Sequence, residues 1–138
     1  MSSTASCLTE IYVIAFTSGV SGGDADEHHN IEIQASGEVQ HLQLYNRPGD
    51  DMLSNKGDLW KINFSSFGFV DSCITIGEIE KVYITENNDD GWHIQSIMTL
   101  VQDSESGIQV LTQDLGVNRW IDGDHPDITR RHLLLTFA

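Results

Sequence analysis

Short runs in which apolar and polar residues alternate constrain the fold of this chain more than any other feature of its sequence. Between residues 30 and 35, Ile31, Ile33 and Ala35 fall on one side of an extended chain, and Glu32 and Gln34 fall on the other. Similar runs recur along the sequence, whereas the periodicity of a helix is almost absent. The pattern predicts β-strands that bury one face and expose the other.

The alternation predicts eight strands joined by short connections. Ser36-Gly37 is expected to form a two-residue turn between two of them. Strands with one polar face each indicate an all-β fold, an antiparallel sandwich or barrel, built as a single domain over residues 1–138. The expected strands cover residues 10–16, 30–35, 38–45, 58–65, 79–85, 92–101, 107–112 and 132–137.

The chain is strongly acidic, with 21 Asp and Glu against seven Lys and Arg and a formal net charge of −14. Binding to nucleic acid, or direct binding to an anionic membrane, is not expected, because phosphate groups are held by an excess of cationic side chains. No segment is long and apolar enough to form a membrane-spanning helix. The first residues lack the basic start and apolar run of a secretory signal, which leaves a cytoplasmic protein and a secreted protein in mature form as alternatives.

The acidic side chains are concentrated in alternate connections between the expected strands. When antiparallel strands follow one another, the first, third and fifth connections fall at one end of a sandwich and the others at the opposite end. Those three connections span residues 17–29, 46–57 and 86–91. With the neighbouring Asp58, they hold nine of the 21 carboxylates: Asp24, Asp26, Glu27, Asp50, Asp51, Asp58, Glu86, Asp89 and Asp90.

Carboxylates gathered at one end repel one another, and a bound cation would relieve the repulsion. A like-charged pair about 4 Å apart costs roughly 4 kcal/mol at an effective dielectric constant near ~20. Calcium is the expected ion, because it takes about six to eight oxygen ligands from carboxylates, amide side chains and backbone carbonyls of flexible loops. Asn46, Asn87 and Asn88 add amide oxygens, although no EF-hand spacing occurs. The alternative is three solvated acidic turns that hold no metal.

Three further residues are candidates for contact with a surface or a partner. Met52 and Leu53 are apolar residues in an otherwise polar connection, where they either cap the core or form an exposed wedge that enters a lipid surface or a partner's pocket. Trp120 either packs on the sandwich or offers an exposed ring beside Asp122 and Asp124, an arrangement that suits a lectin-like site.

The sequence carries no recognisable catalytic motif. There is no Gly-x-Ser-x-Gly elbow and no nucleophile placed beside a base, so enzymatic activity is not expected. The six histidines show no paired spacing with Cys or Glu of the kind that binds zinc.

Cys7 and Cys73 are the two cysteines of the chain, and they match no metal or redox motif. They can pair as a disulfide in an oxidising compartment or remain as two buried thiols. The sequence slightly favours free thiols.

Ile76-Gly77-Glu78-Ile79 opens one expected strand, and Asn87-Asn88-Asp89-Asp90-Gly91-Trp92-His93 is an Asp/Asn-rich run that leads into the next. Together with three further segments, they resemble in order the PLAT domain, a module of lipoxygenases, lipases, polycystins and the clostridial alpha-toxin. The first is similar to the family's Leu/Ile-Gly-x-Ile/Leu strand, and the second is similar to its Asp/Asn-rich loop and the strand start that follows. Gly22-Gly23-Asp24-Ala25-Asp26, Gly57-Asp58-Leu59-Trp60-Lys61-Ile62 and Asn118-Arg119-Trp120-Ile121 resemble three further family segments. The set covers most of a core at about residues 9–121, and residues 122–138 form a C-terminal strand extension beyond the family pattern.

The resemblance implies an eight-stranded antiparallel β-sandwich that binds membranes or protein partners, often with calcium. Matched residue by residue, it implies Asp24, Asp26, Asn88 and Asp89 as calcium ligands, with Gly22 and Asp90 as additional candidates. In the family the module accompanies catalytic domains, and here it is expected to stand alone and to inherit no catalysis. The expected function is a calcium-dependent module that docks to lipid surfaces or membrane-associated partners. The alternative is a glycan-binding or protein-binding protein of the lectin-like, toxin-like or defence type.

Overall fold

The computed structural model describes residues 6–19, 29–44, 56–86, 92–105, 107–121 and 132–138. These residues form nine β-strands and two short 3₁₀ helices. Among them, no helix is long and apolar enough to cross a membrane. The elements are β1 (Leu8–Thr17), β2 (His29–Ala35), β3 (Glu38–Gln43), β4 (Gly57–Asn63), η1 (Phe64–Phe67), η2 (Ile76–Glu78), β5 (Ile79–Glu86), β6 (Trp92–Asp103), β7 (Ile108–Asp114), β8 (Arg119–Ile121) and β9 (His132–Leu134).

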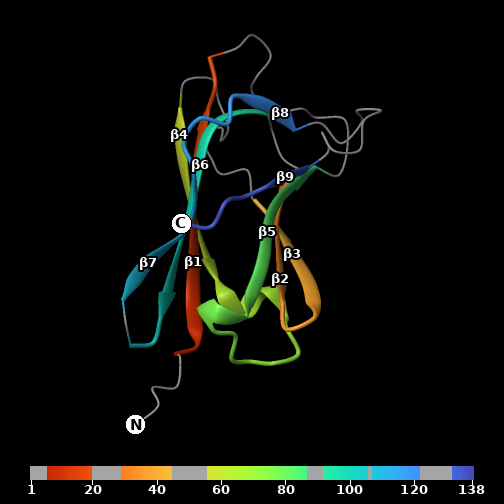
Figure 1. Cartoon of the computed structure of the whole chain (residues 1–138), viewed down its shortest axis with the longest axis vertical. Helices are drawn as coiled ribbons and strands as arrows, with labels where there is room; N and C mark the ends of the chain where they lie inside the picture. The colour runs from red at the N-terminus through yellow and green to blue at the C-terminus, as the bar shows by residue number, and fades with distance from the viewer. Residues whose placement is uncertain (1–5, 20–28, 45–55, 87–91, 106, 122–131) are drawn as a thin grey trace.

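The strands form two antiparallel sheets that pack face to face as a sandwich (Figure 1). One sheet has five strands in the order β4-β1-β6-β7, with β8 also paired to β6. The other has four strands in the order β3-β2-β5-β9. The all-β antiparallel sandwich expected from the sequence is confirmed.

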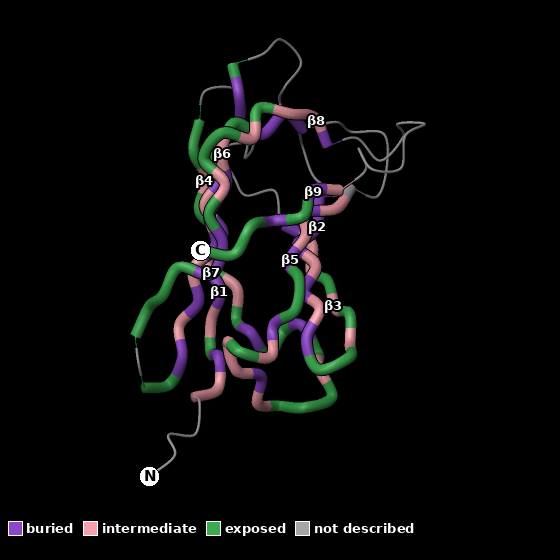
Figure 2. The backbone as a smooth tube through the Cα atoms, viewed as in Figure 1, coloured by how far each residue is buried: buried purple, intermediate pink, exposed green. Residues whose placement is uncertain are grey.

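The core lies between the sheets and is built from the alternating residues of the central strands. Along β1, Ile11, Val13 and Ala15 are fully buried, and along β2, Ile31 and Ile33 are fully buried. Figure 2 shows the same alternation of buried residues with half-buried or exposed ones along other strands. The apolar side chains point inward because burying their surface is the main favourable term in folding, whereas the polar ones stay hydrated on the outer faces.

Three elements differ clearly from the prediction. The strand expected over residues 58–65 ends at Asn63, and Phe64–Phe67 continues as the 3₁₀ helix η1. This turn brings Phe64 and Phe67 into the core, where both are at most 4% exposed and their ring centroids lie 5.3 Å apart. The second difference is β8, a three-residue strand that the sequence did not predict. The third is the strand expected over residues 132–137, which ends at Leu134, while Phe137 forms an isolated bridge with Thr112.

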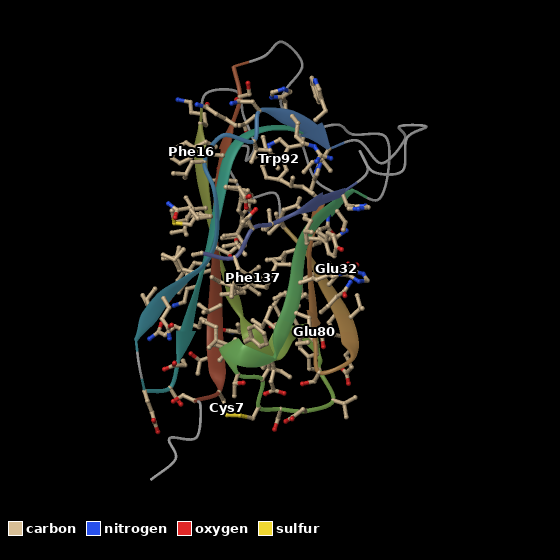
Figure 3. All side chains as sticks on the ribbon, in the orientation of Figure 1. Cys7, Phe16, Glu32, Glu80, Trp92 and Phe137 are labelled. Atoms are coloured by element: carbon tan, nitrogen blue, oxygen red, sulfur yellow. A yellow bond between two sulfur atoms is a disulfide. The ribbon has the colours of Figure 1, made fainter. Side chains whose placement is uncertain are left out.

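Cys7 and Cys73 form a disulfide, so the preference for free thiols was wrong. The backbone explains the pairing, because the Leu8 N–H donates to the Ile74 carbonyl oxygen at 2.7 Å and thereby places the two cysteines side by side. Leu8 begins β1, and Ile74 lies just before η2 and β5, so the disulfide joins segments that lead into opposite sheets. Figure 3 shows Cys7 at the end of the sandwich that is far from Trp92.

Candidate functional site

One end of the sandwich gathers the termini of strands from both sheets, and we call it the loop end. In the five-stranded sheet, Phe16 pairs with Gly57, and Trp92 pairs with Ile121. In the four-stranded sheet, His29 pairs with Glu86, and the Leu44 N–H donates to the His29 carbonyl oxygen at 2.8 Å. The strand termini that define the loop end are Thr17, His29, Gln43, Gly57, Glu86, Trp92, Ile121 and His132.

Four segments of the chain leave from the loop end, and each connects a strand of one sheet to a strand of the other. They cover residues 20–28, 45–55, 87–91 and 122–131, which lie outside the described residues. By sequence they hold ten of the 21 carboxylates, namely Asp24, Asp26, Glu27, Asp50, Asp51, Asp89, Asp90, Asp122, Asp124 and Asp127. The strand termini that flank these segments all lie at the loop end. The prediction that the first three segments leave the sandwich at one end is therefore confirmed.

Sequence reasoning missed the fourth segment, residues 122–131. It follows β8, whose Ile121 pairs with Trp92, and it precedes β9, whose His132 pairs with Thr85 at the same end. Counting connections could not reveal this, because β8 was not recognised as a strand. The available signal was the pair Trp120-Ile121, two residues of high strand preference that follow a turn residue, Asn118, after one intervening residue.

The floor of the loop end is a buried cluster of aromatic and polar side chains that ties the two sheets together. The indole N–H of Trp92 donates to Thr17 Oγ1 at 2.8 Å, and both residues are fully buried. The Trp92 ring meets the rings of His29 and Trp60 edge to face, at centroid distances of 5.1 Å and 6.2 Å. Trp60 and Trp92 are both buried in the core, at 4% and 0% exposed. Thr17, His29 and Trp92 are themselves strand termini, so this floor lies where segments of the chain leave the sandwich.

Trp120 packs against the sandwich rather than standing free. Its ring meets the His93 ring edge to face at a centroid distance of 5.1 Å, and the side chain is half-buried. Next to it, Arg119 donates from Nη2 to the backbone oxygen of His132 at 3.0 Å and so links β8 to the start of β9. Trp120 thus packs on the sandwich with part of its ring, and its role as a contact residue for a partner stays a prediction.

Beneath the loop end, two polar atoms are buried without a hydrogen-bond partner in the described part of the chain: Nδ1 of His93 and Nδ2 of Asn30. Their residues are 8% and 3% exposed. Buried polar groups are normally paired, so these two atoms are exceptions among the described residues.

The predicted ligands Gly22, Asp24, Asp26, Asn88, Asp89 and Asp90, and the predicted contact residues Met52 and Leu53, lie outside the described residues. Within the described ranges, no group of three or more His, Cys, Asp or Glu side chains is arranged to hold a metal. By sequence, the donor chemistry of the segments fits calcium, because they carry carboxylates and amides, the oxygen donors that calcium takes.

Two exposed apolar side chains near the loop end were not singled out from the sequence. Phe16, next to the last residue of β1, is 49% exposed, and Leu59 on β4 is 48% exposed. Both point away from the core, because their neighbours Ala15 and Trp60 point into it. The signal was present in the alternation of residues 11–17, where Phe16 falls on the outward side. Figure 3 shows Phe16 at the loop-end half of the sandwich, on the outside of the five-stranded sheet.

Similar folds occur in solved structures of bacterial toxins and lipoxygenases. The alpha-toxin of Clostridium perfringens, avian strain SWCP, is 17% identical with a TM-score of 0.72, covering 99% of this chain and 33% of the toxin. The alpha-toxin of Clostridium absonum is 20% identical with a TM-score of 0.70, covering 88% of this chain and 31% of the toxin. Coral 8R-lipoxygenase is 12% identical with a TM-score of 0.61, covering 94% of this chain and 17% of the enzyme, and its activation by calcium is described as acting through a C2-like domain.

The chain therefore spans about a third of the toxins and about a sixth of the lipoxygenase that it resembles. At these identities the likeness shows the fold alone. No protein-family model and no functionally curated protein matches the sequence.

Proposed function

We propose that this chain, a β-sandwich with the PLAT-type fold of alpha-toxins and lipoxygenases, is a non-enzymatic module that docks through its loop end onto anionic lipid surfaces in the presence of calcium. The observation that carries the proposal is the convergence on one end of four chain segments that together hold ten carboxylates. The described strand termini bring these segments together from both sheets, although the segments lie far apart in the sequence.

The charge of the chain explains why docking would need a divalent ion. A loop end rich in carboxylates, on a chain of net charge −14, is repelled by anionic head groups. When bound, calcium supplies positive charge and about six to eight oxygen coordination positions, which carboxylates and lipid phosphates can share. Asp24, Asp26, Asn88 and Asp89 would hold the ion, with Gly22 and Asp90 as additional ligands.

Apolar contact would supply the remainder of the binding. Met52 and Leu53 are proposed to enter the lipid surface from the segment between β3 and β4. Phe16 and Leu59, exposed on β1 and β4, add apolar surface on the side of the same end. Fully burying one such side chain contributes roughly 1.5–3 kcal/mol, so two or three of them are enough to affect binding strongly.

Sedimentation with vesicles of phosphatidylserine and phosphatidylcholine tests the proposal. The protein is expected to sediment with the vesicles in calcium and to stay in solution when calcium is chelated. The variant Asp24→Asn/Asp89→Asn should lose most of this binding. The matched control Glu80→Gln/Glu105→Gln removes the same number of charges away from the loop end, and it should bind like the unmodified protein.

The apolar contribution is tested separately with Phe16→Ser. This variant should bind vesicles more weakly while its calcium affinity, measured by titration calorimetry without lipid, stays the same. The proposal fails if the unmodified protein does not bind vesicles in calcium, or if Asp24→Asn/Asp89→Asn binds them as well as the control.

A further inference from the structure

The outer face of the four-stranded sheet carries a shallow depression that none of the roles above uses. Its volume is about 290 Å³, and it is lined by Glu32 and Gln34 of β2, Tyr83 and Thr85 of β5, and His132 of β9. We call it the flank depression. It lies on the side of the sandwich, whereas the segments proposed to hold calcium leave from the loop end.

Strand alternation and register bring these five side chains together. Ile31, Ile33, Val82 and Ile84 point into the core, which turns the residues between and beside them outward. Glu32 lies directly opposite Tyr83, and Thr85 lies directly opposite His132. Figure 3 shows Glu32 on the side of the four-stranded sheet that faces away from the other sheet.

The polar side chains of the flank depression are partly accessible. Glu32, Gln34, Tyr83 and Thr85 are half-buried, and within the described part of the chain none of their side chains makes a hydrogen bond or an ion pair. The rings of Tyr83 and His132 meet edge to face, with centroids 5.3 Å apart and an angle of 89° between their planes. That packing holds the two rings in a fixed relation at one wall of the depression.

The mixture of donors and acceptors indicates the chemistry of the ligand. An ionised Glu32 only accepts hydrogen bonds, whereas Gln34, Tyr83, Thr85 and a neutral His132 both donate and accept. The hydroxyl groups of a ligand also donate and accept hydrogen bonds. Several hydroxyl groups on one ring can therefore form hydrogen bonds with these side chains at the same time. The Glu32 carboxylate disfavours an anionic ligand, and the presence of so many donors makes the site a poor match for a cation.

We propose that the flank depression binds a neutral, hydroxyl-rich ring, namely a sugar residue of a glycan. Glu32 and Gln34 bond its hydroxyl groups, and the ring of Tyr83 contacts its C–H face. The open shape suits a residue within a longer saccharide, because such a chain can lie along the flat face of the sheet and leave at either side. This binding needs neither calcium nor lipid, so it is independent of the function proposed for the loop end.

Affinity electrophoresis in calcium-free gels, each containing one soluble neutral polysaccharide, tests the inference. A mixed-linkage β-glucan, a galactomannan and glycogen are suitable probes, and we expect at least one of them to retard the protein. Against that polysaccharide, Tyr83→Ala and Glu32→Gln should each weaken binding by about tenfold, because each loses a ring contact or a charge-assisted hydrogen bond. Tyr83→Phe, which keeps the ring, should lose less than Tyr83→Ala.

The control is His41→Ala, an exposed position on the same face that lies directly opposite Glu32 on β3 but does not line the depression. It should be retarded like the unmodified protein, and thermal unfolding of every variant checks that each is folded. The inference is overturned if none of the three polysaccharides retards the protein, or if Tyr83→Ala and Glu32→Gln are retarded like the control. Retention of an arginine-rich peptide that is lost at high ionic strength, without retention of any glycan, would overturn it equally.

Discussion

Glu78 holds together two turns that are far apart in the sequence. Its Oε1 accepts hydrogen bonds from the backbone N–H and the hydroxyl of Thr75, both at 3.1 Å, which caps η2. Its Oε2 accepts a hydrogen bond from the hydroxyl of Ser36, 42 residues earlier in the chain. Ser36 has a φ of 50° in the tight turn between β2 and β3, a conformation that non-glycine residues rarely adopt, so this contact helps to hold it there.

We expect the contribution of Glu78 to stability to depend on pH. The hydrogen bond from Ser36, followed by those from Thr75, lowers the pKa of the Glu78 carboxyl below its ordinary value of 4.5. Because the folded pKa is the lower one, the stabilisation is fully present above pH 4.5 and is lost as the pH falls through the folded value. Glu78→Gln should therefore be less stable than the unmodified protein at neutral pH, and the difference should shrink in acid.

Urea unfolding across this pH range measures the effect, with Glu80→Gln as the control. Glu80 is an exposed carboxylate two residues further along the chain. A stability difference for Glu78→Gln that grows as the pH falls would contradict the prediction.

Strand β6 connects the other strands of its sheet, since β1 pairs along one edge and β7 and β8 pair along the other. Where β6 meets β7, Thr99 and Thr112 lie opposite each other and are fully buried, with their hydroxyl oxygens 2.6 Å apart. The pair sits next to the irregularity in register between Thr99 and Leu100. A buried hydroxyl pair of this kind satisfies both members only while both are present.

A double-mutant cycle on this pair should be strongly non-additive. Thr99→Val or Thr112→Val alone leaves one hydroxyl buried without its partner and should lower the free energy of unfolding by about 1–3 kcal/mol. Changing both residues to valine should cost much less than the two single changes added together, because no hydroxyl is then left unpaired. Chemical unfolding of the four proteins measures the coupling, and additive effects would show that the hydroxyl pair contributes nothing.

At this scale, the sequence predicted strands wherever alternation runs for six residues or more, and it missed features that depend on packing. Trp120 and Ile121 pair with β6 because the Val117 N–H donates to the Gln95 backbone oxygen at 3.0 Å and Asn118 turns the chain at a φ of 43°. Three residues show too little alternation to be recognised as a strand. The alternation of Trp60 and Ile62 predicts that Phe64 continues the strand, whereas its packing with Phe67 favours a helical turn.

Across the whole molecule, the disulfide closes the end that lies opposite the loop end. It joins residues 66 positions apart. In the chain-entropy model, a crosslink that closes a loop of this length lowers the entropy of the unfolded chain and stabilises the fold by about 4 kcal/mol. Cys7→Ser/Cys73→Ser should therefore lower the free energy of unfolding by about 2–4 kcal/mol. Guanidinium unfolding of the oxidised protein and the variant measures this, and equal stability of the two would contradict it.

The sequence predicted at which end of the sandwich the candidate site lies, but not the positions of its atoms. The order of the strands sufficed to bring three acidic segments to one end, because side-to-side pairing of antiparallel strands fixes where their connections fall. Cysteine pairing was not predictable in this way, since it depends on the hydrogen bond between Leu8 and Ile74, which joins residues from distant segments. The flank depression was missed for a related reason: Tyr83 and His132 come together only through the pairing of β5 with β9.

The crosslink between Cys7 and Cys73 also determines how the molecule would carry mechanical load. Tension applied at the two termini passes through the sulfur–sulfur bond directly from Cys7 to Cys73, so the intervening chain, which includes β1 to β4, bears none of it. The two cysteines are 66 positions apart, so the chain between them would measure roughly 220–240 Å if fully extended. The pulling force cannot extend this part of the chain while the disulfide is intact. An oxidised molecule held by its ends would yield only from β5 onward, and reduction would release the hidden length.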